Sequence, residues 1–230
     1  MDDVTSTMVE FPGGGKGRNA AGFLVRPRGA GKSPGVVVIQ EVWGLVDHIK
    51  DIANRLAREG YAALAPDLFD RKTTTSLEEG RRIRDSHTEE KLLGDLRGAV
   101  HYLRNQEFVR GDRIGAVGYC MGGWLSLLLA CRETLTACVV YYGRNPTPVD
   151  QVQNVICPIL GHYGGADPGI TEQDISILKE TLTKHGKAFD IKVYPGAPHA
   201  FFNDTRPSYR PEAAKDSWQR TLLYFSKYLK

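Results

Sequence analysis

The feature that most restricts the fold of this chain is a repeated alternation between short apolar runs and longer amphipathic ones. Runs such as "GVVVIQ" (35–40) and "RIGAVGY" (113–119) are typical of buried strands. The stretch "DHIKDIANRLAREG" (47–60) instead has its apolar residues at helical spacing and ends at a glycine. Because the order β-α-β repeats, we expect an α/β fold with a mostly parallel central sheet and helices on both faces.

The same patterns predict the remaining elements. Further strands are expected at 5–11, 22–26, 61–66, 137–143 and 189–195, with another inside 157–165. Further helices are expected at about 88–106, 121–131, 171–186 and 211–229, the last with Pro211 in its first turn. A capping box, "SLEE" (76–79), is expected to open a polar helix. The stretch "PGGGKGRNAA" (12–21) lacks the spacing of a phosphate-binding loop, and we interpret it as a hairpin loop.

Length and composition indicate an ordinary globular protein. A chain of 230 residues with 41% hydrophobic and 25% charged residues is expected to form a single domain spanning 1–230, with a core that needs no disulfide or metal. The net charge of +3, from 30 basic and 27 acidic residues, gives no basis for a nucleic-acid partner. We expect a monomer or a weak homodimer.

The sequence does not indicate export, membrane insertion or metal binding. The longest apolar runs, "VVVI" (36–39) and "WLSLLLAC" (124–131), are far shorter than the roughly 20 residues of a membrane span. The first residues, "MDDVTSTMVEF", lack the apolar region of a signal peptide. The four cysteines form no C-x-x-C pair, which argues against a zinc or thioredoxin-like site. Free thiols without an export signal favour the cytoplasm.

The stretch "GYCMGG" (118–123) lies between an expected strand and an expected helix. The frame G-x-S-x-G in that setting is the nucleophile elbow of α/β-hydrolases, here with Cys120 at the central position. Close neighbours on such a turn must lack side chains, and the N-terminus of the following helix favours a thiolate. The alternative is a buried cysteine in a glycine-rich turn.

Two further residues fit the chain order nucleophile, acid, histidine of α/β-hydrolases. Asp167 follows the strand within "CPILGHYGG", and His199 follows the strand "FDIKVYP". Because the carboxyl ends of parallel strands meet at one edge of a sheet, both are expected near Cys120. The alternatives are a turn residue beside Pro168 and a surface histidine. His162 is a weaker candidate for the base, because it lies inside a strand and is expected to be structural.

From about residue 22 to the end, the chain resembles the dienelactone hydrolases (carboxymethylenebutenolidases) of the α/β-hydrolase superfamily. The motifs that carry the resemblance are "QEVWGL" (40–45), "APDLF" (65–69), "GYCMGG", "YYG" (141–143), "HYGGADP" (162–168) and "YPGAPHAF" (194–201). The cysteine in the elbow is the specific mark, since most of the superfamily carries serine there. The resemblance implies the triad Cys120, Asp167 and His199, and a thioester intermediate formed without a cofactor or metal.

The resemblance also implies roles for the residues after "VVVIQ". The family's matching glutamate, here Glu41, contacts the resting thiol and takes its proton when substrate binds. The backbone N–H groups of Val42 and Met121 would form the oxyanion hole. From spacing alone, Glu41 could equally be a solvated loop carboxylate.

The family binds a substrate carboxylate with arginines, and the sequence leaves their identity open. Arg81, Arg82 and Arg84 are candidates for the first, and we favour Arg81. Asn203 stands about where the family has the second arginine, and Arg206 comes three residues later. Trp43 and Phe201 are candidates for walls of the pocket, although aromatic residues there are as often part of the core.

The predicted function is therefore hydrolysis of a lactone or carboxylic ester, with that small molecule as the partner and with no membrane or nucleic acid involved. One alternative is a broader carboxylesterase acting on uncharged esters. A second alternative is an α/β-hydrolase fold without catalytic activity that is used for binding. The complete Cys-Asp-His set makes this the weaker hypothesis.

Overall fold

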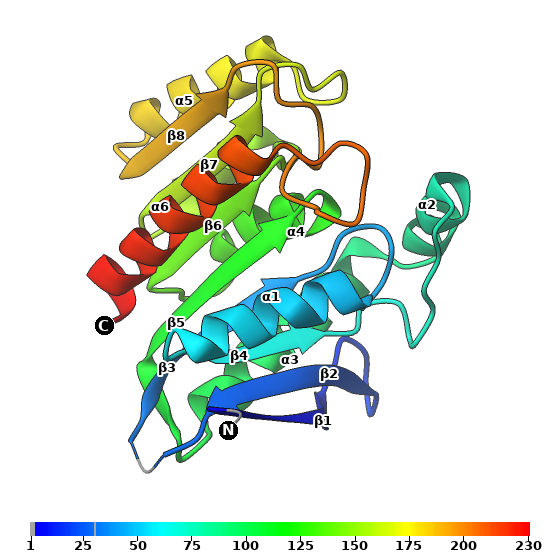
Figure 1. The fold of residues 1–230 in the computed structure, drawn as a ribbon, viewed down its shortest axis with the longest axis vertical. Coiled ribbons are helices and arrows are strands. Elements are labelled where there is room, and N and C mark those ends of the chain that lie inside the picture. Colours follow the sequence, from blue (N-terminus) through cyan, green and yellow to red (C-terminus); the bar gives the residue numbers. More distant parts are fainter. Residues whose placement is uncertain (1–2, 30) are drawn as a thin grey trace. The chain divides into compact units, whose positions relative to one another are not determined.

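The structure, a computed structural model, describes residues 3–29 and 31–230 (Figure 1). The chain divides into two compact units, Met1–Ala116 and Val117–Lys230, which are described in turn. Strand β5 (Val109–Tyr119) runs from the first unit into the second. Across the described residues, every helix is too short or too polar to span a bilayer.

The first unit contains a sheet with the strand order β1-β2-β4-β3. Its strands are β1 (Val4–Pro12), β2 (Asn19–Pro27), β3 (Ser33–Ile39) and β4 (Ala62–Pro66). Strands β1 and β2 form an antiparallel hairpin, β2 pairs with β4 antiparallel, and β3 pairs with β4 parallel. The glycine-rich stretch 12–21 lies at the turn of this hairpin, which confirms its interpretation as a hairpin loop.

Helices α1 (Asp47–Arg58), α2 (Leu77–Asp85) and α3 (Glu89–Arg104) complete this unit. Figure 1 shows α1 in front of the strands and α3 behind them, so both faces of this part of the sheet are covered. The apolar run of β3 is buried throughout, as expected for a strand covered on both faces. All five apolar positions that predicted α1 are buried: Ile49, Ile52, Ala53, Leu56 and Ala57.

The start of α2 differs from the predicted capping box in one respect. Ser76 does cap the helix, because its hydroxyl accepts a hydrogen bond from the backbone N–H of Glu79. The Glu79 carboxylate, however, accepts a hydrogen bond from the Thr74 hydroxyl at 2.6 Å. A complete capping box is found instead at the start of α5 (Glu172–Lys184), between Thr171 and Asp174.

The second unit contains three parallel strands in the order β6-β7-β8. They are β6 (Ala137–Tyr141), β7 (Ile159–Gly164) and β8 (Phe189–Tyr194). Helix α4 (Met121–Ala130) packs against β6, and α6 (Pro211–Leu229) packs against β6 and β7. Figure 1 shows α6 in front of the strands and α4 behind them. A 3₁₀ helix (Val149–Asn154), which the sequence did not predict, and α5 (Glu172–Lys184) complete this unit.

The predicted α/β class with mostly parallel pairing is confirmed; among the pairings described, the antiparallel ones are β1 with β2 and β2 with β4. In the second unit Tyr141 pairs with His162, and Gly164 pairs with Tyr194. Strands β6, β7 and β8 therefore end along one edge. The loops that carry Asp167 and His199 start from this edge.

Candidate active site

Cys120 lies at the tight turn between β5 and α4, where it is the N-cap of the helix. Its backbone has φ 56° and ψ −113°, a conformation that costs a non-glycine residue about 1–3 kcal/mol. The turn is held by a hydrogen bond of 3.0 Å from the Cys120 N–H to the carbonyl of Tyr141. A strained residue locked in this way is the geometry that the elbow motif predicts.

Two glycines allow the strand, the turn and the helix to approach so closely. A Cβ on Gly118 would lie 1.8 Å from the carbonyl oxygen of Gly122. A Cβ on Gly123 would lie 2.5 Å from the carbonyl oxygen of Tyr141. No real Cβ tolerates such distances, so the side chain of Cys120 stands on a turn whose close contacts are backbone to backbone.

Cys120 differs from the other three cysteines in its surroundings. It is partly exposed, whereas Cys131, Cys138 and Cys157 are buried. Burial raises the pKa of Cys131 to about 11 and that of Cys157 to about 12, and it raises the pKa of Cys138 well above its ordinary value. These three thiols are inert at neutral pH, which leaves Cys120 as the candidate nucleophile.

His199 and Asp167 form a direct pair in the loops after β8 and β7. Nδ1 of His199 lies 2.6 Å from Oδ2 of Asp167. The other carboxylate oxygen, Oδ1, accepts hydrogen bonds from the N–H groups of Gly169 (2.8 Å) and Ile170 (3.2 Å). The carboxylate is thus fixed on both sides and can only accept, so Nδ1 of His199 carries the proton in this bond.

The charge state of His199 follows from its neighbours. Burial by itself lowers the pKa of His199, but the hydrogen bonds and charges of Asp167 and Cys120 outweigh burial and raise this pKa to about 10. The imidazolium form therefore predominates at neutral pH. The imidazolium and the N-terminus of α4 both place positive charge beside the Cys120 sulfur.

Aromatic residues pack against the ring of His199 and against one another. The ring of Tyr142 meets the ring of His199 edge-on, with centroids 5.1 Å apart and planes at 61°. Phe201 packs against Tyr142 at 5.4 Å and has no exposed surface. Tyr142 itself has a positive φ of 38°. Phe201 therefore packs against Tyr142 in the core, which is the alternative to a pocket wall that the sequence left open.

Three further sequence-predicted residues, Glu41, Val42 and Trp43, lie in the first unit, in the loop that follows β3. Glu41 and Val42 are buried, and Trp43 is partly exposed. The segment leading into α2 packs directly on this loop, since Thr74 donates a backbone hydrogen bond of 3.1 Å to the carbonyl of Trp43. Gly80 of α2 approaches so closely that a Cβ there would lie 2.5 Å from the carbonyl oxygen of Val42.

Comparison with known proteins identifies the family. The family model described as "Dienelactone hydrolase family" matches residues 20–229. The chain belongs to the dienelactone hydrolase family. A relative from Synechocystis sp., named "putative carboxymethylenebutenolidase", is 32% identical over 99% of both chains. A relative from Bradyrhizobium sp., named "probable 2-oxo-3-(5-oxofuran-2-ylidene)propanoate lactonase", is 32% identical over 94% of this chain and 92% of the relative.

Solved structures agree with this assignment to the dienelactone hydrolases. A "putative dienelactone hydrolase" from Klebsiella pneumoniae superposes with a TM-score of 0.89 at 31% identity, covering 97% of this chain and 100% of its own. A dienelactone hydrolase-like promiscuous phosphotriesterase from metagenomic libraries gives a TM-score of 0.88 at 25% identity, covering 99% of this chain and 100% of its own. The protein is a hydrolase of the dienelactone hydrolase type with the α/β-hydrolase fold.

The arginine candidates of this dienelactone hydrolase differ in their surroundings on α2. Arg82 lies 3.7 Å from the Glu79 carboxylate, and Arg84 lies 2.7 Å from that of Asp85. Arg81 is exposed. Two of the three guanidinium groups thus have a carboxylate neighbour on the same helix, which leaves Arg81 as the preferred candidate.

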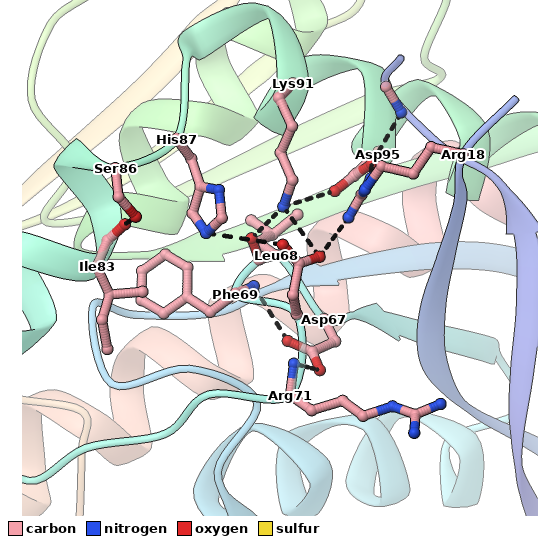
Figure 2. A network of polar contacts seen from close by, with 12 residues as sticks. Arg18, Asp67, Leu68, Phe69, Arg71, Ile83, Ser86, His87, Lys91 and Asp95 are labelled. Carbon is pink, nitrogen blue, oxygen red and sulfur yellow. Dashed lines mark hydrogen bonds and ion pairs between the residues drawn. The ribbon is translucent and has the colours of Figure 1, made fainter. Parts of the chain in front are cut away.

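The base of the segment that leads to α2 is anchored by a polar network that the sequence did not reveal (Figure 2). Lys91 of α3 donates a hydrogen bond of 2.6 Å to the carbonyl of Leu68, directly after β4. Arg18, from the hairpin loop, forms ion pairs with Asp70 and with the fully buried Asp95. Residues distant in sequence share these contacts, so no local motif predicts them.

In the loop after His199, a buried asparagine stands at about the position where the resemblance expects the second arginine. Asn203 is 1% exposed, and its side-chain oxygen accepts hydrogen bonds from the N–H (3.0 Å) and hydroxyl (2.7 Å) of Thr205. Its side chain thereby shapes the turn. Arg206 follows in the same turn and is partly exposed.

The structure defines the surroundings of two further residues, His162 and Tyr142. His162 is fully buried, with hydroxyl partners on both ring nitrogens, which confirms its expected structural character. Tyr142 was absent from the predicted site, yet its ring contacts that of His199. The signal that points to Tyr142 is its place directly after β6, at the edge from which the other site loops start.

Proposed function

We propose that this protein hydrolyses a lactone or carboxylic ester by acyl transfer to Cys120. The observation that carries the proposal is the 2.6 Å pair between His199 and a fixed Asp167 carboxylate, with a strained Cys120 elbow in the same unit. Nucleophile, base and orienting acid in this relation are the recurring apparatus of acyl transfer. Family membership supports the same reaction class.

In the first half-reaction the Cys120 thiolate adds to the carbonyl carbon. The backbone N–H of Met121, at the first turn of α4, is a donor for the resulting oxyanion, and the family resemblance suggests that of Val42 as the second. The C–O bond then breaks, and the His199 imidazolium gives its proton to the departing oxygen. Cys120 is left as a thioester, and His199 is left neutral.

In the second half-reaction neutral His199 takes a proton from water as the water oxygen adds to the thioester carbon. The C–S bond breaks, which releases the carboxylic acid product and frees the Cys120 sulfur. Asp167 holds His199 in one orientation throughout. We further propose, from the family resemblance, that Glu41 assists in removing the thiol proton when substrate binds.

The favoured substrate class is an unsaturated lactone that carries a carboxylate. The Bradyrhizobium relative is named for such a compound, an oxofuran-ylidene propanoate. Arg81, exposed on α2, is the residue we assign to the substrate carboxylate. Trp43 and Arg206 are further candidates for contacts with the substrate.

One observation favours a second candidate, a carboxylesterase acting on uncharged esters. The side chain of Asn203, at the position of the family's second arginine, is engaged in a turn with Thr205. A site with one fewer guanidinium binds a carboxylate less strongly. The two candidates share all steps at Cys120.

A panel of lactones and short-chain esters, each with and without a free carboxylate, tests the function and separates these candidates. We expect turnover that is lost after iodoacetamide treatment, and a kcat/KM for carboxylate-bearing lactones that falls in Arg81→Gln. Arg82→Gln is the matched control on the same helix. Absence of turnover across the panel would refute the proposed hydrolysis.

A further inference from the structure

The loop that follows β3 is in backbone contact with the chain segment that leads into α2, within the first unit. We call residues 42–44 the β3 turn and residues 72–80 the supporting segment. The carbonyl of Trp43, in the middle of the β3 turn, accepts a hydrogen bond of 3.1 Å from the N–H of Thr74. On either side of this bond, a glycine lets the two backbones approach more closely still.

These two glycines are Gly80 and Gly44. A Cβ on Gly80 would lie 2.5 Å from the carbonyl oxygen of Val42 and 3.1 Å from its Cγ2 atom. A Cβ on Gly44, which has φ 87°, would lie 2.3 Å from the carbonyl oxygen of Lys72. The nearest neighbours are backbone atoms, which cannot rotate away as the end of a flexible side chain can. Neither position therefore accepts a larger residue without a shift of the chain.

Gly80 is unusual within its own helix. Most residues of α2 are exposed, and only Gly80 and Ile83 are buried. A glycine inside a helix costs about 1 kcal/mol relative to alanine, which is a large penalty for a helix of nine residues. The contact with Val42 gives the physical reason for a glycine here, because alanine would suit the helix better but would collide with the β3 turn.

Hydrogen bonds hold the supporting segment in place. The Thr74 hydroxyl accepts from the N–H of Ser76 at 3.0 Å and donates to the Glu79 carboxylate at 2.6 Å. These bonds tie the start of the segment to the first turn of α2. Before the segment begins, Lys91 of α3 donates a hydrogen bond of 2.6 Å to the carbonyl of Leu68 (Figure 2). Because the segment is held in this way, we expect the β3 turn to yield when the two are pushed apart.

The β3 turn matters for catalysis because of the N–H of Val42. The carbonyl and the N–H of Val42 belong to the two planar peptide groups that meet at its Cα, so a push on the carbonyl also reorients the N–H. The family resemblance suggests this N–H as the second oxyanion donor. A donor stabilises the oxyanion only at about 2.7–3.1 Å from the oxygen, so a small reorientation is enough to lower the rate.

We propose that Gly80 is a positioning residue for the oxyanion hole, because its missing side chain lets α2 hold the Val42 peptide in the orientation that catalysis needs. Gly80 would act through Val42 and not on the substrate itself. The effect on turnover rests on the proposed hydrolysis and on Val42 as the second donor. The effect on the conformation of the β3 turn does not.

The test compares Gly80→Ala with Gly111→Ala in the full-length protein. Gly111 of β5 is the matched control, because a Cβ there would also lie 2.5 Å from a carbonyl oxygen, that of Arg104. The substrate is an uncharged activated ester, so that any movement of Arg81 with α2 leaves binding unchanged. We expect Gly80→Ala to lose roughly 10- to 100-fold in kcat with little change in KM, and Gly111→Ala to keep the wild-type kcat.

Two further readouts separate the oxyanion hole from the rest of the site. Iodoacetamide loses iodide from a tetrahedral carbon and forms no oxyanion, so the rate of Cys120 alkylation should be equal in the wild type and Gly80→Ala. Backbone amide NMR reports on the β3 turn directly. The signals of residues 42–44 should shift in Gly80→Ala and stay in place in Gly111→Ala.

Thr74→Val provides a milder variant. It keeps the backbone hydrogen bond to Trp43 but removes both bonds of the Thr74 hydroxyl. Thr74 is partly exposed, so Thr74→Val should fold even if Gly80→Ala does not. We expect a loss of about fivefold in kcat on the uncharged ester, with alkylation of Cys120 unchanged.

A kcat loss in folded Gly80→Ala no larger than that in Gly111→Ala would overturn the positioning role, as would a wild-type kcat in Thr74→Val if Gly80→Ala did not fold. An alkylation rate that falls together with kcat would place the defect at Cys120 or His199 and would also overturn it. An inactive wild type would refute the proposed hydrolysis instead, and the NMR signals would still decide whether Gly80 fixes the β3 turn.

Discussion

Two histidines of the second unit, His199 in the loop after β8 and His162 inside β7, have opposite electrostatic surroundings. Burial by itself would lower the pKa of both histidines. At His199 a carboxylate lies 2.6 Å from the ring and a thiol lies beside it, and these contacts raise its pKa to about 10. The ring of His162 is bonded to two hydroxyls, and its pKa stays near 3.

The difference teaches where an acid–base group can be built in this fold. Both histidines belong to hydrogen-bonded chains that contain an aspartate. In the His162 chain the hydroxyl of Tyr194 stands between the ring and Asp216, so no ionised group touches the ring. The hydroxyl between ring and carboxylate thus leaves His162 neutral and structural. His199, in direct contact with a carboxylate, is protonated at neutral pH and positioned for proton transfer.

The largest expected effect comes from removing the thiol that His199 faces. Cys120→Ala should abolish turnover. Cys120→Ser should keep some hydrolysis of activated esters but lose roughly 10²–10⁴-fold on lactones, because a serine hydroxyl must surrender its proton during attack. Steady-state kinetics on matched ester and lactone substrates check both variants. Equal lactone turnover in wild type and Cys120→Ser would contradict the role of sulfur.

The next largest effect is expected from a substitution that leaves His199, like His162, without a carboxylate in contact with its ring. Asp167→Asn removes the carboxylate that raises the pKa of His199, and we expect a loss of about 10²-fold in kcat. In the wild type the rate should fall as pH rises through about 10, where the imidazolium loses its proton. In Asp167→Asn this alkaline limb should shift to lower pH. A limb that does not move would show that Asp167 does not control the proton on His199.

Stability should depend on pH with opposite signs at the two histidines. The raised pKa of His199 means that its contribution is present below pH 6.5 and is lost as pH rises toward 10. For His162 the unfolded chain binds a proton below about pH 6.5 and the folded protein does not, so stability falls as pH falls toward 3, by on the order of 1 kcal/mol per pH unit.

Urea unfolding at a series of pH values measures both slopes. His199→Gln should flatten the dependence between pH 7 and 10 and leave the acid side unchanged. If His199→Gln keeps the wild-type slope on the alkaline side, the raised pKa of His199 is wrong.

The smallest effect concerns the thiols themselves. Cys120 should react with iodoacetamide at neutral pH faster than the buried Cys131, Cys138 and Cys157. Peptide mapping at early times gives the order of labelling. If His199 stabilises the thiolate, Asp167→Asn should slow labelling of Cys120 more than Glu41→Gln does. Earlier labelling of any other cysteine would argue against Cys120 as the nucleophile.

Much of the fold and of the triad could be predicted because the signals are local. The helical spacing in 47–60, the strand runs and the glycines around Cys120 each act over a few residues. Asp167 and His199 were placed by chain order and by their position after a strand, and the structure brings them into contact. The elbow needed no long-range information, because a tight turn is specified by its own glycines.

The remainder depends on contacts between distant segments. The ion pairs of Arg18 with Asp70 and Asp95 join residues more than fifty positions apart, and the hydrogen bonds of His162 join β7 to Tyr194 of β8 and to Thr221 of α6. Single residues in such networks have many possible partners. The predicted capping box is incomplete for a local reason: the Ser76 N–H donates to the Thr74 hydroxyl, which in turn donates to the Glu79 carboxylate.

The central claim is that catalysis passes through an acyl group on Cys120, and trapping that group tests it most directly. The enzyme is mixed with excess activated ester, quenched with acid within the first turnover, digested and analysed by mass spectrometry. The account predicts an acyl mass on the peptide that contains Cys120, formed at least as fast as product and absent from Cys120→Ala. Product formation by Cys120→Ala at the wild-type rate, or an acyl group on another residue, would contradict it.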